Sequence, residues 1–83
     1  MSVDKTLEDR RSTHGDFLDH ATATQHLKMV MHDHPGWDNL DVMQREALDM
    51  IAHKIGRVLS GDPNFADHWH DIQGYARLIE VRL

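Results

Sequence analysis

The sequence predicts an all-α protein, a small antiparallel bundle of three long helices preceded by a short N-terminal helix. Apolar residues recur at spacings of three and four, and no alternating pattern typical of a strand occurs. Pro35 and Pro63 stand beside Gly36 and Gly61, in contexts that favour turns and divide the chain. Because the chain has only 83 residues, we expect one domain, residues 1–83, with dimerisation as one way to complete its small core.

The first two helices are predicted from their capping residues. A short helix is expected from Val3 to about Arg11, with Ser2 or Asp4 as its cap and a turn over residues 12–15. The second helix begins after Asp16 and ends within residues 32–36. Its weakly apolar face comprises Phe17, Ala21, Thr24, Leu27 or Lys28, and Met31.

The third helix has the strongest pattern. Asn39 or Asp41 is expected to cap it, and Gly61 to end it. Its broad apolar face comprises Leu40, Gln44, Ala47, Leu48, Ile51, Ile55, Val58 and Leu59.

The fourth helix follows residues 62–64, with Asn64 as the expected cap. Its apolar residues step alternately by four and three, which predicts a seam against another helix. They are Phe65, Trp69, Ile72, Ala76, Ile79 and Leu83. Gly74 lies inside this helix, where glycine lowers helix propensity. It either allows a helix or a ligand to approach closely or is simply tolerated.

Composition excludes several classes of function. Cysteine is absent, so disulfides, thiolate metal sites and cysteine catalysis are excluded. No apolar run is long enough to span a membrane. The net charge of −5 argues against direct nucleic-acid binding. Eight histidines are unusually many for this length.

Paired carboxylates on the last two helices are the candidate metal ligands. Glu46 and Asp49 lie about one turn apart on one helix, as do Asp67 and Asp71 on the next. Two facing helices that each carry such a pair could hold a hard cation such as Mg²⁺. A solvated charged surface and a contact with a partner protein are the alternatives.

Two methionines suggest a surface for a partner. Met43 and Met50 are a heptad apart and lie away from the main apolar face of their helix. A second apolar stripe on a small helix is typical of an interface, so we expect a homodimer or a complex with another protein. Ordinary exposure of methionine is the alternative.

Three segments resemble an uncharacterised family of small phage and prophage proteins. Residues 11–17, RSTHGDF, resemble its R-x-x-H-G-D/S-F opening. Residues 44–55 resemble its helix-three signature, and residues 61–64 with 67–76 resemble its third block. The resemblance implies a phage or prophage origin and the cytoplasm of an infected or lysogenic bacterium.

More distantly, the layout is similar to the MazG-like all-α nucleoside triphosphate pyrophosphohydrolases, which bind Mg²⁺ through an E-x-x-E and an E-x-x-D helix. Glu46 and Asp49 match the first pair, with aspartate in place of glutamate. Asp71 matches the final aspartate, His68 replaces the preceding glutamate, and Asp67 is a substitute one turn before Asp71. Fewer anionic oxygens weaken Mg²⁺ binding, so this resemblance implies nucleotide binding more strongly than hydrolysis.

The same resemblance implies roles for four further residues. Lys54 and Arg57 would neutralise phosphate, and Tyr75 or Trp69 would stack on a base. The first hypothesis is therefore a phage accessory protein that binds a (deoxy)nucleotide with Mg²⁺. The alternatives are a non-enzymatic protein that inhibits a host defence or nucleic-acid-processing protein, and a small structural component of phage assembly.

Overall fold

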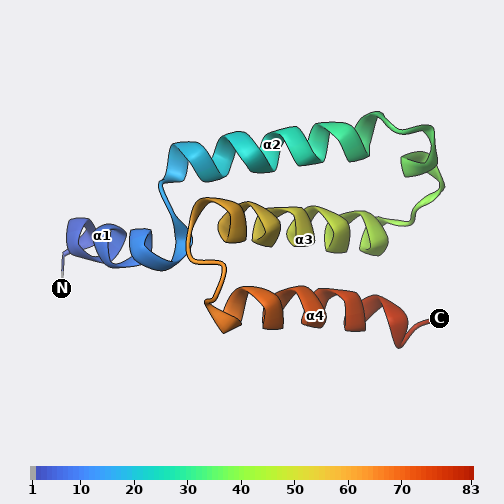
Figure 1. Ribbon diagram of the computed structural model, residues 1–83. Coiled ribbons are helices and arrows are strands. Elements are labelled where there is room, and N and C mark those ends of the chain that lie inside the picture. The colour runs from blue at the N-terminus through green and yellow to red at the C-terminus, as the bar shows by residue number, and fades with distance from the viewer. Residues whose placement is uncertain (1) are drawn as a thin grey trace.

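A computed structural model describes residues 2–83, which contain helices and no strand. The all-α fold class is therefore confirmed for the described part of the chain. The elements are α1 (Val3–His14), α2 (Phe17–Asp33), the short 3₁₀ helix η1 (Pro35–Asn39), α3 (Val42–Ser60) and α4 (Ala66–Glu80) (Figure 1).

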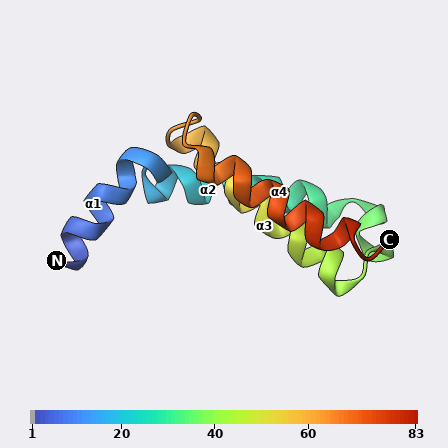
Figure 2. The ribbon, with the colours of Figure 1, turned by 90° about the horizontal axis from the view of Figure 1, so that it is seen from below.

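The three long helices lie side by side with α3 in the middle. α2 and α4 both run antiparallel to α3 and pack against it from opposite sides (Figure 1). The view turned by 90° shows α4 in front, with α3 and α2 behind it (Figure 2). Packing of α2 against α4, which would close a compact three-helix bundle, is not a substantial contact among residues 2–83. The arrangement is therefore an open layer whose middle helix has two uncovered faces.

The helix starts follow the predicted caps at three places. Ser2 caps α1 and Asp16 caps α2. Asp41 caps α3 in a reciprocal capping box with Gln44, whose side chain accepts from the Asp41 N–H at 3.0 Å. The turn predicted over residues 12–15 is wrong in part, because α1 continues to His14 before the chain turns.

The predicted cap of α4 is wrong. Phe65 occupies the N-cap position and makes no side-chain cap hydrogen bond. Asn64 instead donates its backbone N–H to Oδ1 of Asp62 at 2.9 Å, a local turn that competes with capping. The 3₁₀ helix η1 was not predicted either; the Nδ1 atom of His34 accepts from the Gly36 N–H at its start.

The apolar core is very small. Only Ala47 and Ala52 are buried hydrophobic residues among residues 2–83, and the buried polar side chains are His20, Thr24 and His68. The sequence predicted Trp69 on the packing seam of α4, but Trp69 is 51% exposed. The buried residue of α4 is its neighbour His68, because its ring hydrogen-bonds the end of α1.

The two uncovered faces of α3 differ in chemistry. Leu48, Ile55 and Leu59 recur at helical spacing on one face, and all three are at least partly exposed. The opposite face carries His53 and Arg57. No helix among residues 2–83 is both long enough and apolar enough to cross a bilayer.

Candidate functional site

A pocket of about 330 Å³ lies where α1, α2 and α3 meet. Its volume is in the range of small-molecule sites. The lining residues come from the end of α1, the start of α2 and the last turns of α3: Leu7, Arg10, Arg11, His14, Gly15, Asp16, Phe17, His20 and Arg57. Most of them lie within the RSTHGDF segment or immediately beside it.

Beside the pocket, the turn between α1 and α2 crosses the end of α3 in close contact. Gly15 has a φ of +81°, and a Cβ there would collide with the backbone of Ser60. A Cβ on Gly61 would collide with the backbone of Thr13. The Thr13 carbonyl accepts from the Asp62 N–H at 3.1 Å and from Nε2 of His68 at 2.8 Å. These contacts hold the α1–α2 turn against the end of α3.

Arg57 reaches the pocket from α3. Its Nε donates to Nε2 of His53 at 3.2 Å, and the His53 ring stands edge-on to the His20 ring with centroids 4.5 Å apart. Burial lowers the pKa of Arg57, and the neighbouring Arg10 lowers it further. The guanidinium nevertheless stays charged. A cation is therefore held in a half-buried position beside neutral rings.

The histidines around Arg57 titrate below their ordinary range. Burial is the largest cause that lowers the pKa of His53 to about 4, and the positive charge of Arg57 is the second. The pKa of His20 is lowered by the same two causes in the same order. Burial, Arg57 and Arg10 lower the pKa of His14. Each lowered pKa means that the protonated, positively charged form of the ring is disfavoured at this place.

The charges that line the pocket are unbalanced. Arg10, Arg11 and Arg57 contribute three guanidinium groups, and Asp16 is the one carboxylate in the lining. Asp16 caps α2, with Oδ2 at 3.5 Å from the Asp19 backbone nitrogen. Within residues 2–83, none of the three arginines forms an ion pair with a carboxylate. The pocket therefore offers donors and positive charge to an anion.

The structure places the predicted metal ligands in separate local contacts. Oδ1 of Asp49 lies 2.7 Å from Nε2 of His32 on α2. Oδ2 of Asp71 lies 2.9 Å from Nζ of Lys54, which lowers the pKa of the Asp71 carboxyl. Glu46 and Asp67 are exposed. Across residues 2–83, no three His, Asp or Glu side chains are grouped closely enough to hold a metal ion.

The residues predicted to bind nucleotide are divided between two places. Arg57 lines the pocket at the α1–α2–α3 junction. Lys54 is brought to Asp71 on α4, and Tyr75 lines a shallow depression beside Asp71. The methionines predicted to face a partner are exposed to different extents, since Met43 is exposed and Met50 is half-buried.

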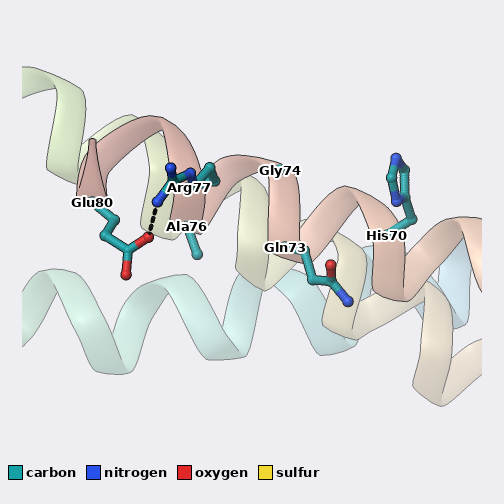
Figure 3. Close-up of a pocket in the computed structure, with 6 residues that line it drawn as sticks. All are labelled: His70, Gln73, Gly74, Ala76, Arg77 and Glu80. Carbon is teal, nitrogen blue, oxygen red and sulfur yellow. Dashed lines mark hydrogen bonds and ion pairs between the residues drawn. The ribbon is translucent and has the colours of Figure 1, made fainter. Parts of the chain in front are cut away.

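A second depression follows the outer side of α4 (Figure 3). All six of its lining residues belong to that helix, and Arg77 pairs with Glu80 at one end. A Cβ on Gly74 would meet no atom within 4 Å, so packing within the chain does not require this glycine. Because α4 alone lines this depression, no second element encloses a ligand there, and Arg77 is already paired with Glu80.

Sequence reasoning missed most of the pocket. Arg10, Arg11, His14 and His20 were not among the predicted site residues, although Arg11 and His14 were noticed as part of a motif. The available signal was in α1, where Arg10 and Arg11 lie about one turn before His14, which immediately precedes Gly15.

The comparisons with known proteins give no match: no family model fits the chain, and no curated protein or solved structure is significantly similar.

Proposed function

We propose that the protein binds a small phosphate-bearing molecule, with a (deoxy)nucleotide as the expected class, in the pocket formed by α1, α2 and α3. The observation that carries this proposal is the burial and hydrogen bonding of the Arg57 guanidinium. Its guanidinium is half-buried, donates to the neutral ring of His53 and has no carboxylate partner within residues 2–83. A half-buried cation without a counterion carries part of the desolvation cost of a buried charge, and a bound anion would offset that cost.

Three arginines favour phosphate among the anions. A guanidinium presents its N–H donors as a planar fork that matches two phosphate oxygens. Arg10, Arg11 and Arg57 line one pocket, so they can share the several oxygens of a diphosphate or triphosphate. A singly charged carboxylate would leave most of these donors unused.

An aromatic ring at the pocket favours a nucleotide over inorganic phosphate. Phe17 lines the same pocket and is 80% exposed. An exposed ring beside a phosphate site offers a stacking surface for a base. Phe17 therefore takes the stacking role expected of Tyr75 or Trp69. Tyr75 lines a different depression, and Trp69 belongs to α4, which contributes no residue to this pocket.

The proposal concerns binding and not hydrolysis. Asp49 contacts His32 and Asp71 contacts Lys54, so the carboxylates predicted to bind Mg²⁺ do not converge on one point. The residues as arranged do not fit a metal cage made by the chain alone.

Calorimetric titration tests the proposal with deoxynucleoside triphosphates, pyrophosphate, inorganic phosphate and an uncharged deoxynucleoside. We expect the triphosphate to bind and the deoxynucleoside to bind at least tenfold more weakly. Arg57→Gln should weaken triphosphate binding by about tenfold or more, since one charge-assisted contact contributes about 1.5–3 kcal/mol. Arg77→Gln is the matched control, because it removes the same charge from the outer side of α4.

Amide shifts of ¹⁵N-labelled protein locate the ligand independently. Shifts concentrated in residues 10–20 and 53–57 would support the proposed pocket. Shifts confined to residues 67–75 would contradict it and place the ligand on α4. A spectrum unchanged at millimolar triphosphate would overturn the proposal.

The alternative of a host-protein inhibitor is favoured by a different observation, the large exposed apolar surface. Among residues 2–83, fifteen large hydrophobic residues are exposed, and surfaces of this kind in small proteins are commonly covered by another chain.

A further inference from the structure

We infer that a second copy of this chain covers the apolar side of the helix layer. We define the apolar face by residues of α3 and α4 that lie on the side opposite the arginine pocket: Leu48, Ile51, Ile55, Leu59, Trp69 and Ala76. Leu48, Ile51 and Ala76 line one groove of about 310 Å³ between α3 and α4. Ile55 and Leu59 follow Leu48 at spacings of seven and eleven, and Trp69 precedes Ala76 by seven.

The exposed area of the chain is too large for a compact monomer. A folded protein of 9.6 kDa is expected to expose about 5,100 Å², whereas this chain exposes 6088 Å². The excess of about 1,000 Å² is close to the roughly 800 Å² that each partner buries in a standard protein interface. One interface of ordinary size therefore accounts for the excess.

The small core favours a partner that is present as the chain folds. Ala47 and Ala52 are the only fully buried hydrophobic residues within residues 2–83, and larger apolar side chains such as Ile51 and Ile79 are only half-buried. Burial of this extent offsets little of the entropy of ordering the chain. Another copy is available at the moment of folding, as in obligate homodimers.

The composition of the face suits self-association. The groove between α3 and α4 is lined by uncharged residues only, with Leu40, Gln44, Ala47 and Ile79 completing it. Each copy carries a net charge of −5, so an uncharged face brings two copies together with less electrostatic repulsion than an acidic face would. A partner selected by charge complementarity to an acidic protein would bind a different surface.

Stacking two layers through this face leaves both arginine pockets accessible. His53 and Arg57 lie on the other side of α3. The inference does not depend on the proposed function, because the apolar face and the pocket share no lining residue.

A matched pair of leucines tests the inference by sedimentation equilibrium. Leu59 lies on the apolar face and is 67% exposed, and Leu18 lies on the outer side of α2 and is 73% exposed. We expect the wild-type chain to sediment at twice 9.6 kDa at micromolar concentration. Leu59→Glu should raise the dimer dissociation constant at least tenfold, and Leu18→Glu should leave it unchanged.

The thermal midpoint of the unmodified chain provides a second measurement that does not depend on a variant. The midpoint of a dimer that unfolds to monomers rises with protein concentration, whereas that of a monomer does not. A single-chain mass at 100 µM with a constant midpoint would overturn the inference, as would a dimer that Leu18→Glu weakens as much as Leu59→Glu. A complex that forms only with a different protein would overturn it as well.

Discussion

Arg57 donates from Nε to Nε2 of His53 across 3.2 Å, one turn apart on α3. A guanidinium has no acceptor, so Nε2 of His53 must carry a lone pair and the ring is neutral, with its proton on Nδ1. The ring also faces His20 from α2, and Lys28 and Lys54 add positive charge nearby. Protonation of His53 would break this hydrogen bond and place two cations side by side.

We therefore predict that the protein loses stability as the pH falls from about 6.5 to 4. The pKa of His53 is about 4 in the folded chain and 6.5 by the ordinary value. The unfolded state binds this proton first, so stabilisation is complete above pH 6.5 and is lost toward pH 4. The loss should be on the order of 2–3 kcal/mol, and His14 and His20 add to it in the same direction. Urea unfolding at pH 7 and pH 4.5 measures it.

His53→Gln should reduce this pH dependence, since the amide oxygen still accepts from Arg57 but does not titrate. His70→Gln is the control, because His70 is exposed on α4. An equal slope in the wild-type chain and His53→Gln would show that His53 does not cause the acid sensitivity.

Two glycines inside helices should respond to alanine in opposite ways. A Cβ on Gly56 would collide with Oγ1 of Thr24 and lie 2.9 Å from Nδ1 of His20, whereas a Cβ on Gly74 would meet nothing within 4 Å. Both substitutions gain about 1 kcal/mol of helix propensity. We expect Gly74→Ala to stabilise by about 0.5–1 kcal/mol and Gly56→Ala to destabilise by about 1–3 kcal/mol. Thermal or urea unfolding decides, and a stabilising Gly56→Ala would contradict the close contact of α2 with α3.

Anion binding should strengthen as the pH falls below about 6.5. His14 and His20 line the pocket, and the pKa of each is lowered in the free protein. A bound anion favours their protonated forms and raises both pKa values, so protons and anion bind cooperatively. Sulfate is a suitable probe because it does not titrate in this range. Calorimetry at pH 7.5 and pH 6 should show tighter binding at the lower pH, and equal affinity would exclude the two histidines from the site.

The hydrogen bond from His68 to the Thr13 carbonyl should stabilise the fold. His68 is 1% exposed, and its Nε2 donates across 2.8 Å to a residue 55 positions away. His68→Phe keeps a ring of similar shape and removes the donor, at a cost of about 1–3 kcal/mol. His70→Phe, on the exposed side of the same helix, should cost less than 0.5 kcal/mol, as is usual at the surface. Similar losses for both would contradict the role given to His68.

Local signals in the sequence were sufficient to predict the positions of the α-helices and most of their N-terminal caps. Asp16 and Asp41 act through atoms within four residues, so a single sequence contains the whole interaction. The face that each helix buries was harder to predict. Hydrophobic periodicity favoured Trp69 over His68, whereas the buried position goes to the residue that can reach the Thr13 carbonyl, a contact that spacing along the chain does not show.

The candidate site was predictable only in part for the same reason. Arg57 was chosen from the stripe on α3, but its neighbours Arg10 and Arg11 come from α1. Their approach depends on the crossing of Gly15 with Ser60, which no local pattern indicates. Conversely, Asp49 and Asp71 had suitable helical positions, but Asp49 lies against His32 of α2 and Asp71 against Lys54 of α3, because α3 separates the two outer helices.

The crossing of Gly15 with Ser60 and of Gly61 with Thr13 has a consequence for the rate of unfolding. It joins the open end of the α2–α3 hairpin, and closing a loop of this length in a disordered chain would cost about 3–4 kcal/mol. Once the hairpin has formed, its ends are already adjacent, so the crossing forms late and at little cost. Substitutions at Gly15 or Gly61 should then accelerate unfolding and leave the folding rate nearly unchanged. The crossing therefore controls the unfolding rate, and with it the lifetime of the native state.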